Sequence, residues 1–129
     1  MPDVIVNASP LQYLHQIQQL DLLRAMYGRV IVPQGVRREI AIGVARGVDL
    51  PALDSLAWVA TEIPDPHVLA GVPSALGTGE REVIALALER GGLAVLDDRA
   101  ARVSAAMLGV VLTGTLGILV KAKLSGLLP

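Results

Sequence analysis

Cysteine and phenylalanine are absent from the 129-residue sequence, which also contains only one Trp and two Tyr. Without cysteine the chain can form neither disulfide bridges nor thiolate metal sites, as is common in a reducing compartment. The scarcity of aromatic residues also removes the stacking platforms with which many single-strand-binding proteins hold bases. Disulfide-stapled folds, zinc modules with cysteine ligands and aromatic single-strand binders are therefore excluded or disfavoured.

A strong charge of either sign is also missing, because 11 basic and 12 acidic residues give a net charge of −1. A broad basic surface for nucleic acid is thus not expected, and any nucleic acid must be met by a local patch or through a metal ion. The length fits one domain over residues 1–129, large enough to bury a core without staples. Met1-Pro2-Asp3 shows no basic segment of a secretory signal, so a cytoplasmic location is expected.

One long uncharged segment needs an explanation, because residues 103–120 contain no charge between Arg102 and Lys121. Eighteen such residues are long enough to be a candidate membrane span. Glycine and threonine interrupt the middle of the segment, at Gly109, Thr113, Gly114, Thr115 and Gly117. A strand, a turn and a helix fit this pattern better than a membrane helix, and no membrane association is predicted.

The hydrophobic pattern predicts strands and helices in alternation along the chain. Strands are expected at residues 3–7, 29–33, 57–63, 93–96 and 110–112, with 57–63 at an edge. Helices are expected at residues 11–19, 20–27, 34–46, 80–90, 99–108 and 115–124, with a short helix at 48–56 and a loop or weak helix at 64–77. Continuous apolar strands indicate a parallel sheet covered on both faces, hence a three-layer α/β domain.

Polar side chains follow three of the predicted strands, where ligands bind in open parallel sheets. They are Asn7 and Ser9, Asp97 and Asp98, and Thr113 and Thr115. Carboxylate, hydroxyl and amide oxygens are the donors that hard divalent cations prefer. The pattern therefore predicts an oxygen-rich site at the carboxyl edge of the sheet.

Two glutamates lie on apolar helical stripes. Glu80 shares its stripe with Val83 and Ile84, whereas Glu82 is expected to point more towards solvent. Glu39 also has mainly apolar neighbours one turn away, and neither Glu39 nor Glu80 has a basic partner on its own helix. Such carboxylates need a partner from elsewhere, and a divalent cation that activates a hydroxide and polarises a phosphate is one.

Several motifs together resemble those of PIN-domain proteins. They are the run 4–11 ending in Asn7-Ala-Ser-Pro-Leu11, Val32-Pro33 followed by Glu39, Gly79-Glu80, the run 96–102, Thr113-Gly-Thr-Leu-Gly117, Ala122-Lys123 and Gly126-Leu-Leu128. More narrowly, the chain looks like a prokaryotic PIN-like subfamily of the ribonuclease and toxin type, often described as a domain of unknown function. The resemblance covers nearly the whole chain in order.

The resemblance implies a metal-dependent ribonuclease that uses Mg²⁺ or Mn²⁺, forms a homodimer and acts as the toxin of a toxin–antitoxin pair, with RNA as substrate and an antitoxin protein as partner. By the same resemblance, Asn7 matches the first metal ligand and Glu39, Glu80 and Asp98 match the second, third and fourth acids. Asp97 matches the position next to Asp98, and Ser9 matches a hydroxyl near the metal. Glu39, Glu80 and Asp98 are thus the expected catalytic residues, with Thr113 and Thr115 in support.

Asn7 stands where the family usually has an aspartate, so the cluster loses one charge and its metal affinity should fall. A catalytically weak or inactive module that binds RNA or a partner protein is therefore the alternative. A third hypothesis is a receiver domain or small phosphatase, because adjacent acids after a strand suit those too. Its disadvantage is that Asp97-Asp98 comes late in the chain and that Lys121 and Lys123 lie in the last predicted helix.

Each candidate residue also has a structural interpretation. Ser9 can cap a helix whose first residue is Pro10, and Asp97 or Asp98 can cap the helix that follows. Glu80 suits the positive end of its helix. Residues 77–79 lack the lysine of a phosphate-binding loop and are interpreted as a turn and cap. Three arginines are expected to contact phosphates or to form a solvated face: Arg37, Arg38 and Arg99.

Overall fold

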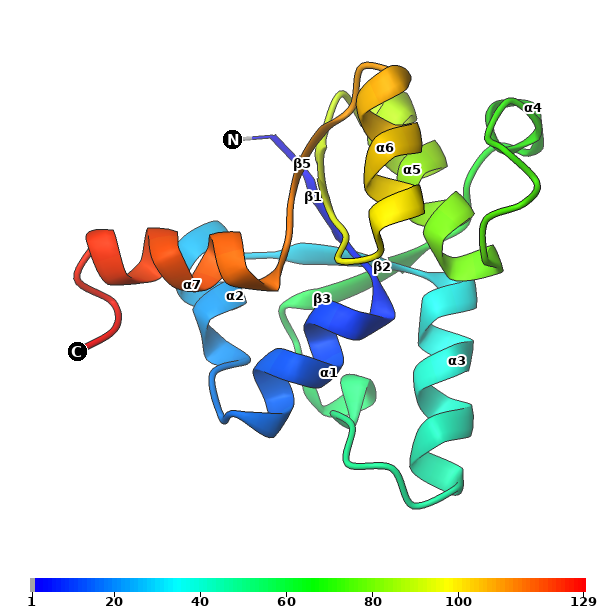
Figure 1. Cartoon of the computed structure of the whole chain (residues 1–129). Helices are drawn as coiled ribbons and strands as arrows, with labels where there is room; N and C mark the ends of the chain where they lie inside the picture. The colour runs from blue at the N-terminus through cyan, green and yellow to red at the C-terminus, as the bar shows by residue number, and fades with distance from the viewer. Residues whose placement is uncertain (1) are drawn as a thin grey trace.

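The computed structural model describes residues 2–129, which form a sheet of five parallel strands. The strands are β1 (Val4–Val6), β2 (Val30–Pro33), β3 (Val59–Glu62), β4 (Leu93–Val95) and β5 (Val111–Thr113), in the spatial order β3-β2-β1-β4-β5 (Figure 1). The chain moves outward from β1 to β3 and then returns to β4 on the other side of β1. This reversal opens a crevice at the carboxyl ends of β1 and β4, where open α/β sheets bind ligands.

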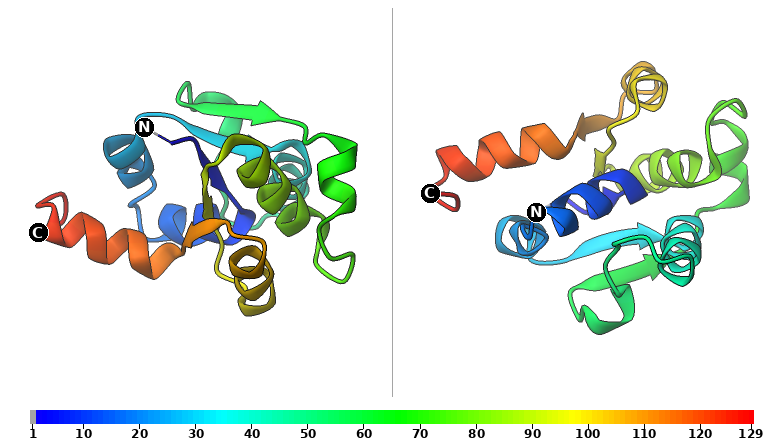
Figure 2. Two further views of the ribbon diagram at one scale, coloured as in Figure 1. Left: turned by 90° about the horizontal axis from the view of Figure 1, so that it is seen from above. Right: turned by 60° about the horizontal axis from the view of Figure 1, so that its bottom comes forward.

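Seven α-helices flank the sheet in the described part of the chain. They are α1 (Ala8–Gln16), α2 (Asp21–Tyr27), α3 (Gln34–Ala45), α4 (Pro66–Ala70), α5 (Thr78–Arg90), α6 (Arg99–Met107) and α7 (Thr115–Leu124). Helices α5 and α6 pack together on one face, and α1, α2 and α7 gather on the other (Figures 1 and 2). Helix α3 contacts both α1 and α5, so it joins the two layers beside the carboxyl edge.

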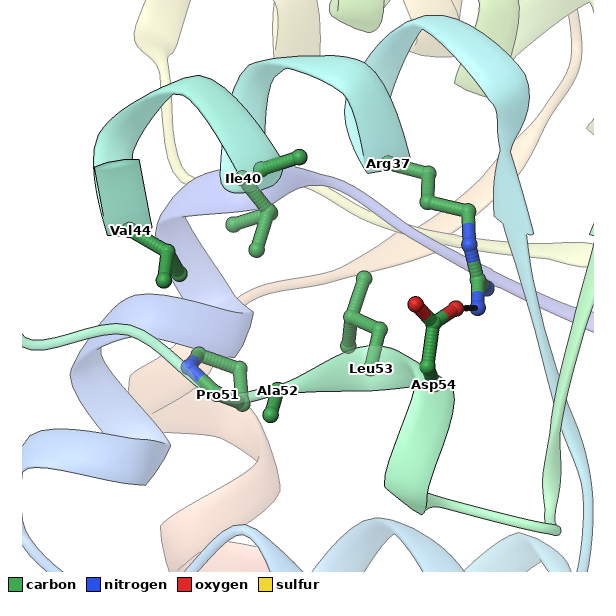
Figure 3. A pocket seen from close by; sticks show the side chains of 8 residues that line it. Arg37, Ile40, Val44, Pro51, Ala52, Leu53 and Asp54 are labelled. Atoms are coloured by element: carbon green, nitrogen blue, oxygen red, sulfur yellow. Dashed lines mark hydrogen bonds and ion pairs between the residues drawn. The ribbon is translucent and has the colours of Figure 1, made fainter. Parts of the chain in front are cut away.

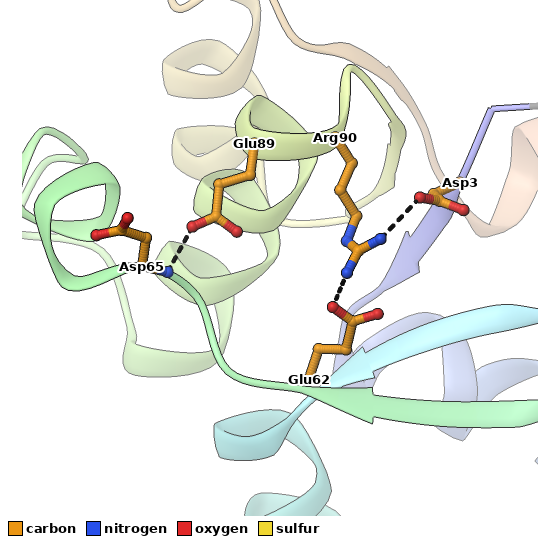
Figure 4. A network of polar contacts seen from close by, with 5 residues as sticks. All are labelled: Asp3, Glu62, Asp65, Glu89 and Arg90. Carbon is orange, nitrogen blue, oxygen red and sulfur yellow. Dashed lines mark hydrogen bonds and ion pairs between the residues drawn. The ribbon is translucent and has the colours of Figure 1, made fainter.

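Helix α5 is the most deeply buried helix. Residues 83–87 are all buried, and the helix contacts β1, β2 and β4 as well as α3, α4 and α6. Its C-terminal end is fixed by Arg90, which pairs with Asp3 at 3.1 Å and with Glu62, while Glu89 accepts the backbone N–H of Asp65 (Figure 4). A helix held along its length and at its end places its first turn firmly at the carboxyl edge.

The predicted α/β class, the parallel sheet and the alternation of elements are confirmed. Strand β3 lies at an edge as expected, and residues 103–120 divide among α6, β5 and α7. Among residues 2–129, no helix has the length and apolar character needed to cross a membrane. The predicted helix at 48–56 shrinks to one 3₁₀ turn, Leu53–Ser55, and the segment 64–77 contains the short helix α4.

The prediction that Ser9 caps the first helix is wrong. Helix α1 begins at Ala8, three residues earlier than predicted, and Asn7 occupies the N-cap position in an extended conformation. Because the chain turns into the helix directly after β1, Ser9 and Pro10 lie within the first turn. Proline is tolerated there, since the first N–H groups of a helix have no partner within the helix.

The prediction that Glu82 points to solvent is also wrong. Its side chain is half-buried, and Oε1 accepts the backbone N–H of Gly35 at 2.9 Å. Gly35 is the second residue of α3, so Glu82 satisfies one of the N–H groups that a helix N-terminus leaves free. A helical wheel of α5 alone could not reveal this acceptor, because the donor lies 47 residues away.

Candidate active site

Asn7 links the end of β1 to the start of α1 and is buried, with 6% of its surface exposed. Its backbone N–H donates to the carbonyl of Val95 at 3.1 Å, which ties the residue to the adjacent strand β4. Its side chain does not cap α1 and forms no hydrogen bond with the other described residues. The amide atoms are not sealed from water, because the buried side-chain nitrogen or oxygen without a partner among residues 2–129 is Nε of Arg81. Asn7 therefore presents a free, neutral amide at the carboxyl edge of the sheet.

Gly79 brings α5 close to Asn7 and Glu39. A Cβ atom at Gly79 would lie 3.2 Å from Asn7 Oδ1, 3.4 Å from Glu39 Oε1 and 3.1 Å from a methyl group of Val36. Glycine therefore allows the first turn of α5 to approach the amide from β1 and the carboxylate from α3. The structure thus brings together three elements that are distant in sequence.

Glu80 and Asp98 complete the group from the starts of α5 and α6. Glu80 Oε1 accepts the N–H of Gly77 at 3.0 Å, and Asp98 Oδ2 accepts the N–H of Ala101 at 3.0 Å. Burial raises the pKa of Glu80 above 4.5, and the negative charges of Asp98 and Glu39 raise it further, while the Gly77 N–H opposes this shift. The carboxylates are therefore close enough to repel one another.

The chemistry of these residues fits a hard divalent cation. Amide and carboxylate oxygens are the donors that Mg²⁺ and Mn²⁺ favour, and one oxygen each of Glu80 and Asp98 accepts no hydrogen bond among residues 2–129. Within the same residues, however, no three His, Cys, Asp or Glu side chains are arranged to enclose a metal ion. The donors are gathered, but they are not set at coordinating distances in this arrangement.

Asp97 has a different environment from Asp98. Its two oxygens accept from the backbone N–H and the hydroxyl of Thr115, at 2.8 and 2.6 Å. Asp97 therefore fastens the end of β4 to the start of α7 instead of facing the acids of α3 and α5. Thr113 lies at the end of β5 with its hydroxyl against Gly117, and Ser9 is half-buried in α1.

The three arginines predicted to contact phosphate separate in the structure. Arg37 pairs with Asp54 and donates to the Thr61 hydroxyl at 2.7 Å, beside a hollow lined by apolar residues of α3 and the 3₁₀ turn (Figure 3). Arg38 instead lines a hollow of about 280 Å³ with Glu39, Thr78 and Gly79. Arg99 is exposed at the first position of α6. Neither Arg38 nor Arg99 forms an ion pair within residues 2–129.

Sequence reasoning gave other roles to two residues that shape this site, because Gly79 was interpreted as part of a turn and cap and Glu82 as facing solvent. The glycine did carry a signal, since it belongs to the Gly79-Glu80 motif. The role of Glu82 carried none, since it depends on how α5 packs against α3. Of the residues predicted for the site, the structure gathers Asn7, Glu39, Glu80 and Asp98.

Comparisons with known proteins agree with the fold. The sequence model of the family described as a PIN domain matches residues 3–129. Among solved structures, a PilT N-terminus domain protein from the archaeon Sulfolobus solfataricus is similar, with a TM-score of 0.64 and 17% identity over 92% of each chain. No curated protein sequence matches the chain at a significant level. At this identity, the structural likeness concerns the fold.

The raised pKa of Glu80 predicts a pH dependence of stability without metal. Between pH 4.5 and the pKa of folded Glu80, the folded chain keeps a proton that the unfolded chain has released. Stability should therefore fall as pH rises through this window. Urea unfolding in EDTA at a series of pH values measures the slope, and Glu80→Gln should flatten it. Equal slopes for the two proteins would show that the pKa of Glu80 is not raised in the folded chain.

Proposed function

Because the chain belongs to the PIN-domain family, we propose that it is a divalent-metal-dependent ribonuclease that hydrolyses phosphodiester bonds of RNA in the cytoplasm. PIN domains are generally nucleases, and the finer proposal is supported by one observation above the others. The Asn7 side-chain amide has no hydrogen-bonding partner among residues 2–129, and its Oδ1 and Glu39 Oε1 both lie against Gly79 in the first turn of α5. A hard cation would take its ligands from the acids on α3, α5 and α6 and from this amide.

In this proposal, Asn7, Glu39, Glu80 and Asp98 would hold Mg²⁺ or Mn²⁺, which supplies an activated hydroxide and neutralises phosphate charge. A bound cation would offset the negative charges of Asp98 and Glu39 that help to raise the pKa of Glu80. Glu39, Glu80 and Asp98 are the proposed catalytic residues. Arg38 and Arg99 lie near the acids without ion pairs, so they would position phosphates, whereas Arg37 is engaged by Asp54.

The first test is a calorimetric titration of Mn²⁺ into the wild type and a Glu80→Gln/Asp98→Asn double variant. Both new side chains keep an oxygen that can accept the helix N–H groups, so the caps survive while two charges are lost. We expect the Mn²⁺ affinity to fall at least about tenfold, because ligand charge tunes affinity. RNA cleavage should fall with it.

An Asp21→Asn/Glu89→Gln variant is the matched control, because it removes the same two charges from α2 and the far end of α5. It should bind Mn²⁺ like the wild type. If both double variants bind equally well, the acids of α3, α5 and α6 do not form the metal site.

The alternative is a catalytically weak or inactive module that binds RNA or a partner, and Asn7 is the observation that favours it. Asn7→Asp separates the two. In a working nuclease, the added charge should raise Mn²⁺ affinity about tenfold and increase cleavage at low metal concentration. In an inactive module, RNA cleavage should stay undetectable in both proteins across the Mn²⁺ titration.

We also propose that the chain forms a homodimer, and exposed apolar side chains along the β5 edge support this. Met107 on α6 is 83% exposed and Val111 on β5 is 71% exposed. On α7, Val120 and Leu124 line a hollow with Leu112 of β5. An uncovered edge strand bordered by apolar side chains is a surface that proteins usually cover, and an isologous contact would cover it with its own copy.

The dimer proposal predicts that Val120→Glu shifts the mass measured by light scattering from twice 13.5 kDa to 13.5 kDa. The introduced charge would be buried at the contact, whereas it would face water in the monomer. Ile63→Glu is the control, because Ile63 is exposed in the loop after β3. A wild type that is monomeric at micromolar concentration would refute the proposal.

The proposed toxin role follows from the family alone. It requires a small antitoxin partner that is encoded nearby and that covers Glu39, Glu80 and Asp98 with one of its segments. Co-purification with the product of the adjacent gene is the direct check, and the nuclease proposal does not depend on its result.

A further inference from the structure

A further hollow, different from those at Arg37, Arg38 and Leu112, lies between α1 and α7, on the β5 side of the acidic residues. Its volume is about 390 Å³, and its lining combines Tyr13 and Ile17 of α1 with Leu116 and Leu119 of α7 and, at one end, Asp97 and Thr115. The lining is almost entirely apolar. Tyr13 is 48% exposed and Leu116 is 74% exposed, so the hollow opens to water.

This hollow adjoins the proposed nuclease site. Asp97 is one of its lining residues and directly precedes Asp98 in the chain, while Tyr13 lies on α1, the helix that Asn7 precedes as N-cap. Tyr13 comes six positions after Asn7, which corresponds to about 9 Å along the axis of α1. On the opposite side of the acids lies the hollow that contains Arg38. The acidic residues therefore lie between a hollow with a cation and one with an aromatic ring.

The ring of Tyr13 is not needed by the core of the domain. Its helix buries Leu11 and Leu14 completely, whereas Tyr13 lies half in water beside other exposed apolar side chains. The other tyrosine, Tyr27, is instead packed against the core, with the Lys121 ammonium 5.9 Å from its ring centre. Tyr13 is thus an available aromatic surface beside the site, although the composition alone had argued against a stacking platform.

We propose that this hollow is a nucleobase subsite, in which Tyr13 stacks on one unpaired base of the RNA next to the phosphate that a cation bound by the acidic residues would hold. This inference rests on the proposed ribonuclease function. A flat, apolar base suits a shallow apolar hollow with an aromatic wall, and stacking tolerates any base. The subsite therefore favours single-stranded over paired RNA without selecting a sequence.

Binding of a fluorescein-labelled single-stranded RNA of about ten nucleotides, measured by anisotropy in EDTA, tests the subsite without cleavage. Tyr13→Phe keeps the ring and should bind within about twofold of the wild type. Tyr13→Leu keeps the apolar volume but loses the ring, and it should bind at least about fivefold more weakly. Ile63→Ala, which truncates an exposed apolar residue away from the hollow, should bind like the wild type.

An abasic scan separates stacking from a structural role of Tyr13. In the wild type, removing the base at one position of the RNA should weaken binding about as much as Tyr13→Leu does. In Tyr13→Leu, the same abasic RNA should bind no worse than intact RNA, because the two changes remove one contact. With Mn²⁺ present, Tyr13→Leu should raise KM for cleavage and leave kcat within about twofold.

The outcomes distinguish this subsite from the nuclease proposal. Cleavage by the wild type with equal RNA affinity in Tyr13→Leu would overturn the subsite and keep the nuclease. Tyr13-dependent binding without cleavage would keep the subsite and overturn the nuclease. Absence of both binding and cleavage would overturn both, and it would leave the hollow to a protein segment such as an antitoxin peptide.

Discussion

The close approach of α5 to β1 and α3 at Gly79 is the constraint on which the site depends. A side chain at this position would press on Asn7, Glu39 and Val36 together. Burial of residues 83–87 and the contacts of Arg90 and Glu89 hold the helix in place from its middle to its C-terminal end. The packing of the core therefore determines how closely the acidic residues approach one another at the carboxyl edge of the sheet.

Gathering carboxylates at one edge is unfavourable unless something offsets their repulsion, and helix N-termini do so here. Four acids accept backbone N–H groups at the starts of four helices: Glu82 at α3, Glu80 at α5, Asp98 at α6 and Asp97 at α7. Each helix start carries a partial positive charge and free N–H donors. The parallel sheet places these helix starts at the same edge, so the topology itself makes an acidic site tolerable without a bound cation.

The sequence was sufficient for the features that depend on local pattern and strand order. The last helix, residues 115–124, was predicted with its observed bounds, and Asp97 and Asp98 were expected directly after strand β4. Contacts between distant elements were not predictable. Glu82 reaches α3, Arg37 turns to Asp54, and Tyr13 meets α7, because these outcomes depend on packing angles that no helical wheel contains. The start of α1 was misplaced because Ser9-Pro10 carries a strong local signal that the turn at Asn7 overrides.

Asn7 is best understood from this balance of charges. It is the most buried polar position of the group, and its side chain lacks a helix N–H of the kind that supports Glu80 and Asp98. An aspartate there would be desolvated beside Glu39 and would increase the repulsion that already raises the pKa of Glu80. The neutral amide lowers that cost in the metal-free chain, while it offers a cation one oxygen without a charge. A neutral amide at this position therefore favours folding without metal. If the proposed ribonuclease function holds, it also weakens metal binding, and more of the affinity for RNA would come from contacts outside the acids, such as Arg38 and the ring of Tyr13.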